Sequence, residues 1–150
     1  MQRRKDMKNP DLLRKELEVM CNRFGVEILY AFGSRAMEIN RVLQGKSAIP
    51  ASSLSDMDIG AKARFKTPFS VHDKIRLAVE LEDLLDVNRV DLCLLNEADP
   101  FLAAEVIRGE RLYCEDELRA DEYELYVLRR AGDLAPLERQ RLSLVLNESR

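Results

Sequence analysis

The sequence predicts an α/β (α+β) fold in which helices pack on one small mixed β-sheet. Helical and strand-like segments alternate along the chain in the order αβαβαβαβα. Most connections between them are short, and no internal repeat or low-complexity tract interrupts the series. Elements that alternate in this way bury their apolar faces by packing helices against a sheet.

The first elements are a helix, a strand and a second, shorter helix. Asn9 and Pro10 form a helix-start signal, and apolar residues then recur at helical spacing at Leu13, Leu17, Met20, Cys21 and Phe24. The segment 26–32, VEILYAF, is rich in β-branched and aromatic residues and predicts a mostly buried strand. Gly33 ends it, and we expect a short helix over about 35–44.

The middle of the chain predicts a loop, a strand and a helix. Residues 45–55, GKSAIPASSLS, contain glycine, proline and four serines without periodicity, which indicates a loop. A strand follows over 56–65. Ser70 and Asp73 resemble a capping box that opens a helix extending to about Asp86. The apolar stripe of this helix is predicted to include Val71, Ile75, Ala78 and Leu85.

The last part of the chain predicts a strand over 89–95 and then a helix that starts at Asp99 and Pro100 and ends near Gly109. A short strand follows over 110–114. Two further helical patterns cover about 118–131 and 136–147.

Length and composition indicate one globular domain over 1–150, with an N-terminal helix within 1–25, a central part over 26–117 and helices over 118–150. Hydrophobic residues make up 46% and charged residues 34% of the chain, unlike disordered chains. The net charge of −3 gives no reason to expect strong nucleic-acid binding. No apolar run reaches the roughly 18 residues that span a bilayer, so no membrane segment is expected.

The three cysteines, Cys21, Cys93 and Cys114, lie far apart, and the chain has one histidine. This spacing excludes the usual zinc motifs. We interpret the cysteines as buried reduced thiols, which indicates a cytoplasmic protein.

Three aspartates interrupt the strands that should be apolar. Asp56 and Asp58 are two residues apart, so they share one face at the start of their strand. In the next predicted strand, the apolar residues share one face and Asp91 points to the other. If the two strands are neighbours, the three carboxylates form a cluster with enough oxygens for two metal ions roughly 4 Å apart. Mg²⁺ binds carboxylates together with substrate phosphates, so the cluster predicts phosphoryl or nucleotidyl transfer.

A phosphate-binding turn is predicted where the first strand ends. Gly33 lets the backbone approach a phosphate, and the Ser34 hydroxyl and nearby N–H groups donate hydrogen bonds to it. The start of the following helix favours negative charge. Arg35 or Lys62 would add a cation for the transferring phosphates.

Each signal has a simpler structural interpretation when taken alone. A Gly–Ser pair before a helix is most often a turn and cap. The aspartates of SDMD could cap local backbone N–H groups, and Asp91 could pair with Arg89 or a surface lysine. Their order along the chain, each beside a predicted strand end, favours the joint interpretation.

The segments GSRA (33–36), SDMDIG (55–60) and VDLCLL (90–95), followed by PFLAAEVIRGERLYCED (100–116), resemble the minimal nucleotidyltransferases of the DNA polymerase β superfamily, the MntA-like antitoxin group. The likeness extends over about 26–117, which by this resemblance is the catalytic core of a single nucleotidyltransferase domain. It implies the nucleotidyltransferase fold. By this resemblance Asp56, Asp58 and Asp91 bind the metal ions, Gly33 and Ser34 hold the nucleoside triphosphate, and Asp91 helps to deprotonate the attacking hydroxyl.

The resemblance also implies the reaction, which is the transfer of AMP from ATP to a hydroxyl with two Mg²⁺ ions. In this group the acceptor is typically a tyrosine of a partner HEPN-domain toxin, which the modification silences. Two alternatives stay open: a non-catalytic antitoxin that acts by contact, and an aminoglycoside-type enzyme with a small-molecule acceptor.

The chain departs from the family pattern in two places. The connection over 35–55 is longer than usual, and its loop over 45–55 would lie over the nucleotide pocket as a lid, a partner contact or a sign of altered substrate. MEIN (37–40) stands where an arginine and a glycine are usual.

Overall fold

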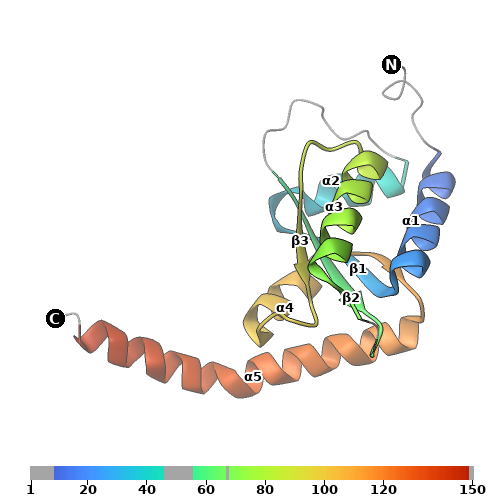
Figure 1. Ribbon diagram of the computed structural model, residues 1–150. Coiled ribbons are helices and arrows are strands. Elements are labelled where there is room, and N and C mark those ends of the chain that lie inside the picture. The colour runs from blue at the N-terminus through green and yellow to red at the C-terminus, as the bar shows by residue number, and fades with distance from the viewer. Residues whose placement is uncertain (1–8, 46–55, 67, 149–150) are drawn as a thin grey trace.

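The computed structural model describes residues 9–45, 56–66 and 68–148. Its elements are α1 (Pro10–Phe24), β1 (Val26–Phe32), the 3₁₀ turn η1 (Gly33–Arg35), α2 (Ala36–Leu43), β2 (Met57–Ala63), α3 (Val71–Leu85), β3 (Val90–Leu94), α4 (Pro100–Ile107), β4 (Glu110–Cys114) and α5 (Glu117–Glu148), shown in Figure 1. The predicted α/β class is therefore confirmed. From residue 46 onward, the predicted loop over 45–55 lies outside the described residues.

The four strands form one mixed sheet in the order β3-β2-β1-β4. β1 pairs antiparallel with β2 and with β4, whereas β2 and β3 run parallel. The sequence hypothesis that the two aspartate-bearing strands are neighbours is thereby confirmed.

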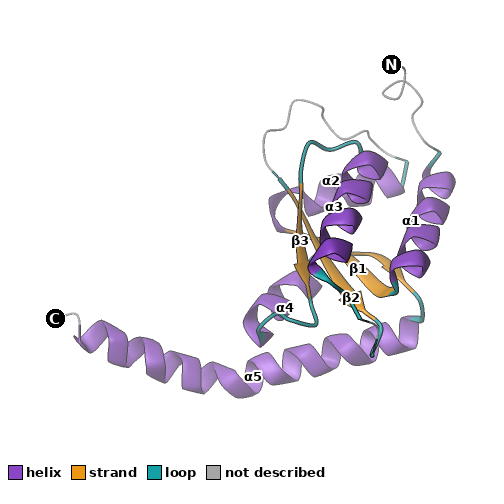
Figure 2. Ribbon diagram, viewed as in Figure 1, coloured by secondary structure: helices purple, strands orange, loops and turns teal. Residues whose placement is uncertain are grey.

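Helices cover both faces of the sheet (Figure 2). On one face α1, α2 and α3 bury a core with residues that include Leu17, Ile39, Leu81 and the sheet residue Ile59. On the other face α4 and the first half of α5 pack over β1, where Tyr30 is completely buried. The sheet is therefore the middle layer between two layers of helices.

Helix boundaries follow the sequence signals closely. The Asn9 side chain accepts a hydrogen bond from the Asp11 N–H at 3.0 Å, and Gly25 ends α1 in the left-handed conformation with φ 73°. Ser70 and Asp73 form the reciprocal capping box that the sequence predicts for α3. These caps satisfy N–H groups that a helix start otherwise leaves unpaired.

The predicted apolar stripe of α3 is wrong at two positions. Val71 is 76% exposed and Ile75 is 57% exposed, while Leu77, Leu81 and Leu85 are buried. The helix carries two apolar stripes, and the stripe of leucines is the one that is buried. Periodicity alone does not decide between two such stripes.

The last two predicted helices are one continuous helix, α5, with Pro136 inside it. Proline cannot donate to the carbonyl four residues earlier, which belongs to Gly132. Both residues are exposed, so water can bond the freed carbonyl and the helix bends without ending. Figure 1 shows this long bent helix extending away from the sheet.

The cysteines in the structure are free, with Cys21 buried and Cys93 and Cys114 partly buried. Burial raises the pKa of the Cys21 thiol to about 12, so this thiol is unreactive. None of the helices in the described ranges combines the length and apolarity needed to span a bilayer.

Candidate active site

Asp58 and Asp91 lie side by side because of the strand register. In the parallel pair of β2 and β3, Asp58 is opposite Asp91. On its other side, in the antiparallel pair of β2 and β1, Asp58 is opposite Phe32. The Asp58 side chain is half-buried and that of Asp91 is exposed. The register thus brings two of the three predicted carboxylates together next to the end of β1.

Gly33 lies directly against the Asp58 carboxylate. Its φ is +76°, a conformation that glycine adopts without steric cost. A Cβ at this position would overlap Asp58 Oδ2. The glycine that the sequence places after the first strand is therefore required by both the turn and the packing against Asp58.

Ser34 and Arg35 complete the turn η1. The Arg35 side chain is only 4% exposed, and its Nε donates to Glu38 Oε2 at 3.1 Å. This burial holds the guanidinium within the turn between β1 and α2. Arg35 therefore lies in the predicted place, but in a packed and ion-paired position.

Asp56 precedes β2 and faces Arg89 across the strand pair. Arg89 Nε and Asp56 Oδ2 are 3.7 Å apart, and both side chains are substantially exposed. The sequence alternative that placed Arg89 beside Asp91 differs from this pairing. An exposed pair at this distance is weak and can open when a stronger partner arrives.

Negative charge accumulates around Asp58. The pKa of its carboxyl is raised, first by burial and then by the charges of Asp91, Asp56 and Glu105. Each of these charges disfavours ionisation of Asp58. The site consequently attracts cations.

Glu105 of α4 is the member of this group that sequence reasoning missed. The sheet face that carries Asp58 also carries Gly60, where a Cβ would overlap Val106 of α4. α4 therefore packs across β2 next to the carboxylates. A charged residue exposed on an otherwise apolar helix, AAEVI, is the only signal of Glu105 in the sequence.

The carboxylates are not arranged as a ready metal centre. Within residues 9–45, 56–66 and 68–148, no group of three or more histidine, cysteine, aspartate or glutamate side chains is placed to hold a metal ion. The structure brings the acidic side chains to one end of the sheet without converging their oxygens on a single point.

Lys62 lies away from the carboxylates. It is opposite Ile28 in the sheet, four residues and thus roughly 13 Å along the strand from Asp58. Its ammonium group forms an ion pair with Glu27 and lies 5.1 Å from the centroid of the Tyr123 ring. The structure therefore does not bring this predicted nucleotide-binding cation to the other candidate residues.

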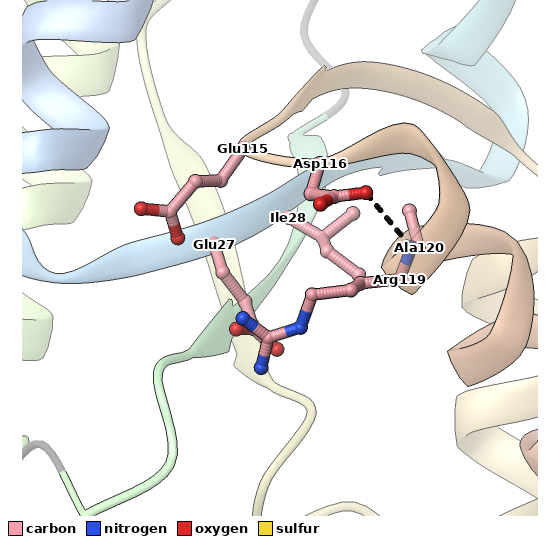
Figure 3. A pocket seen from close by; sticks show the side chains of 6 residues that line it. All are labelled: Glu27, Ile28, Glu115, Asp116, Arg119 and Ala120. Carbon is pink, nitrogen blue, oxygen red and sulfur yellow. Dashed lines mark hydrogen bonds between the residues drawn. The ribbon is translucent and has the colours of Figure 1, made fainter.

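A small pocket is located at that distant end of the sheet (Figure 3). It is lined by Glu27, Ile28, Glu115, Asp116, Arg119 and Ala120, and its volume is about 10 Å³. This space suits roughly one water molecule. Figure 3 also shows the backbone N–H of Arg119 donating a hydrogen bond to the Asp116 carboxylate. The distance from this nitrogen to Asp116 Oδ1 is 3.1 Å. We assign no chemistry to this pocket, because it is too small for a substrate.

Comparison with known proteins supports the fold. Residues 15–118 match the family described as Polymerase beta, Nucleotidyltransferase. A comparison with curated protein sequences found no match.

Among solved structures, a chain of a toxin–antitoxin crystal structure with AMP-PNP is 20% identical, with a TM-score of 0.61, and the match covers 91% of this chain and 98% of that one. A chain of a mutant MntA-HpeT toxin–antitoxin structure is 18% identical, with a TM-score of 0.62 and the same coverage. The structure of a tri-AMPylated Shewanella oneidensis HEPN toxin in complex with MNT antitoxin contains a chain that is 18% identical, with a TM-score of 0.60, covering 95% of this chain and 100% of that one. These likenesses confirm the predicted nucleotidyltransferase fold.

Proposed function

Since the chain belongs to the polymerase β nucleotidyltransferase family, we propose that this nucleotidyltransferase moves AMP from ATP to a tyrosine hydroxyl of a partner HEPN-domain toxin. The modification would silence the toxin, so the protein would act as an antitoxin. Support comes from solved structures of the same fold, one of which contains AMP-PNP and another a tri-AMPylated HEPN toxin with MNT antitoxin.

The observation that carries this proposal is the position of Asp58. It lies between Asp91 on the parallel neighbour β3 and Gly33 at the end of β1. A carboxylate pair beside a glycine turn supplies cation ligands next to a place where a phosphate can approach the backbone.

The chemistry of the donor set suits Mg²⁺, although the carboxylate oxygens in the described residues do not converge on one point. Carboxylate oxygens are the ligands that hard divalent cations prefer, and the like charges that raise the pKa of Asp58 would be neutralised by a cation. We propose that Asp56, Asp58 and Asp91 hold one or two ions, with Asp56 released from Arg89. Bound Mg²⁺ would neutralise the charge of the triphosphate, so that the acceptor oxygen can bond to the α-phosphorus while pyrophosphate leaves.

The remaining roles belong to residues of the turn and of β3. The turn at Gly33 would present backbone N–H groups to a phosphate, and Ser34 would supply a hydroxyl that donates a hydrogen bond to it. The exposed carboxylate of Asp91 accepts the proton of the attacking hydroxyl. Phosphoryl chemistry depends mainly on positioning and charge neutralisation, and Lys62 is left out of this arrangement because of its distance.

The direct test is a transfer assay. The purified protein is incubated with ATP, Mg²⁺ and the HEPN-domain protein encoded beside it, and the partner is then analysed by mass spectrometry. We expect AMP on a tyrosine of the partner, dependent on Mg²⁺. Toxin neutralisation without any added AMP would refute the enzymatic proposal and favour an antitoxin that acts by contact.

Glu105→Gln is expected to raise the Mg²⁺ concentration that gives half-maximal transfer, by roughly tenfold, as for groups just outside a metal's ligands. The reason is that Glu105 adds negative charge beside Asp58. A magnesium titration of the initial rate measures this effect. Glu122→Gln, an exposed change on α5, is the matched control, and an unchanged titration for both variants would exclude this role of Glu105.

A further inference from the structure

A half-buried glutamate of α3 holds the first residue of β3 in place. Glu82 Oε1 accepts a hydrogen bond from the Val90 N–H, with 3.0 Å between the two heavy atoms. The backbone carbonyl of Glu82 also accepts from the N–H groups of Asp86 and Val87, where the helix ends. Glu82 therefore bonds to both ends of the short connection between α3 and β3, and the helix lies against the strand (Figure 1).

The peptide group between Arg89 and Val90 shows which way the bonded N–H points. Its carbonyl faces β2, because it accepts from the Met57 N–H at 3.0 Å. In a trans peptide the N–H points opposite to the carbonyl, and no peptide bond in the described ranges is cis. The Val90 N–H therefore points away from β2, toward the outer edge of the sheet.

That outer edge offers the N–H no backbone partner. Among the residues that the structure describes, β3 pairs with a strand on one side only, since the sheet order is β3-β2-β1-β4. An edge strand leaves its outward N–H groups without a ladder acceptor. Val90 is only 6% exposed, and a buried N–H without an acceptor is destabilising. The Glu82 carboxylate supplies the acceptor, so the peptide is held on both sides.

Asp91 follows this peptide directly, so its position depends on the same two hydrogen bonds. The register that places Asp91 opposite Asp58 begins one residue earlier, with Val90 opposite Met57. A shift of one residue would turn Asp91 to the other face of the sheet. The bond from Val90 to Glu82 fixes this starting point from outside the sheet.

We propose that Glu82 is a positioning residue for AMP transfer, which acts through the Val90 backbone to hold Asp91 beside Asp58. This inference rests on the proposed function, in which Asp91 binds Mg²⁺ and accepts the proton of the attacking hydroxyl. Glu82 touches neither the nucleotide nor the acceptor. Its hydrogen bond keeps the Asp91 carboxylate in the place that both roles require.

Asn96 provides a matched control beyond the other end of β3. Its side chain accepts from the Ala63 N–H at 2.8 Å and donates to the Ala63 carbonyl at 3.2 Å. Like Glu82, it uses a side chain to bond backbone groups beside the strand end. The end of β3 at Leu94 is already roughly 10 Å along the strand from Asp91. Loss of either contact should weaken the fold, whereas only loss of the Glu82 contact should disturb the reaction.

The first measurement needs no activity and no metal. Hydrogen exchange of the Val90 and Asp91 amides is followed by NMR in the unmodified chain, Glu82→Ala, Glu82→Gln and Asn96→Ala. We expect exchange about tenfold faster in Glu82→Ala, because the hydrogen bond is lost. Glu82→Gln keeps an oxygen that can accept this bond, so its exchange and that of Asn96→Ala should stay near the unmodified values.

The second measurement is AMP transfer to the HEPN-domain protein encoded beside the gene, at a temperature where every variant is folded. Glu82→Ala should lower kcat by roughly tenfold to a hundredfold and leave the KM for the acceptor unchanged. The Mg²⁺ concentration for half-maximal transfer should rise roughly tenfold. Glu82→Gln should keep values near those of the unmodified chain, and Asn96→Ala should lower only the melting temperature.

Equal kinetics in Glu82→Ala and Asn96→Ala would overturn the inference, because the glutamate would then serve the fold alone. An equal loss in Glu82→Gln would also overturn it, since that variant keeps an acceptor for the Val90 N–H. If Glu82→Ala does not fold, Glu82→Asp replaces it with the same expected results, because its carboxylate is withdrawn by one methylene.

A failure of the proposed function gives a different result. The unmodified chain would then transfer no AMP, whatever the state of Glu82. Faster exchange at Val90 and Asp91 in Glu82→Ala alone would still support the positioning of Asp91 by Glu82, and unchanged exchange would overturn it.

Discussion

Asp58→Asn is expected to abolish AMP transfer, with a loss of roughly a thousandfold or more, since charge stabilisation at a metal site is worth several kcal/mol. Asp58 is the carboxylate that both neighbouring strands and the Gly33 turn enclose. Asparagine keeps the shape of the side chain but removes the charge that would hold a cation. Initial rates with labelled ATP measure the loss.

The same substitution should leave the ligand-free protein at least as stable as the wild type. Burial and the charges of Asp91, Asp56 and Glu105 raise the pKa of Asp58 above its ordinary value. The folded state therefore binds the proton more tightly than the unfolded state, and ionised Asp58 lowers stability above the folded pKa. This cost disappears as the pH falls through the folded pKa. Thermal unfolding without Mg²⁺ should show that the gain from Asp58→Asn is present at neutral pH and shrinks on acidification.

A matched control separates charge removal at the site from charge removal elsewhere. Asp83 lies exposed on α3, so Asp83→Asn should change neither transfer nor its dependence on Mg²⁺. Full transfer by Asp58→Asn would contradict the assignment of this carboxylate, whatever its effect on stability.

Local signals in the sequence were sufficient to predict these helix boundaries, because caps and turns depend on neighbouring residues. Asn9, Gly25 and the Ser70–Asp73 pair each mark the helix boundary that the structure contains. The choice between the two apolar stripes of α3 and the continuation of α5 through Pro136 depend on tertiary packing and solvent exposure. Neither is encoded in a short window of sequence.

The sequence predicted the candidate site only on the condition that the two aspartate-bearing strands are neighbours in the sheet. Asp58 and Asp91 meet because β2 and β3 are parallel neighbours in a particular register, and the sequence could state that arrangement only as a hypothesis. Lys62 shares the face of Asp58, but four strand residues separate the two by roughly 13 Å, a spacing that the sequence already contained. Glu105 reaches the site from α4 through a long-range packing contact, which no spacing in the sequence reveals.

Gly33→Ala is expected to impair both transfer and stability. A residue with a Cβ at φ +76° is strained by about 1–2 kcal/mol, and the Cβ would also overlap Asp58 Oδ2. The carboxylate must then move, and a displacement of about 1 Å at a reacting centre can lower the rate roughly a hundredfold. Thermal unfolding and AMP transfer by the same preparation measure the two effects.

Gly132→Ala is the matched control, because it is the same substitution in a different environment. Gly132 lies exposed within α5, and a Cβ there would meet nothing within 4 Å. Alanine favours a helix interior over glycine by about 1 kcal/mol, so this variant should be slightly more stable and fully active. If Gly33→Ala instead matched Gly132→Ala in both measurements, the close packing of the turn against Asp58 would have no role in stability or transfer. The two substitutions are therefore predicted to change stability with opposite signs, and only the one beside the carboxylate should affect the reaction.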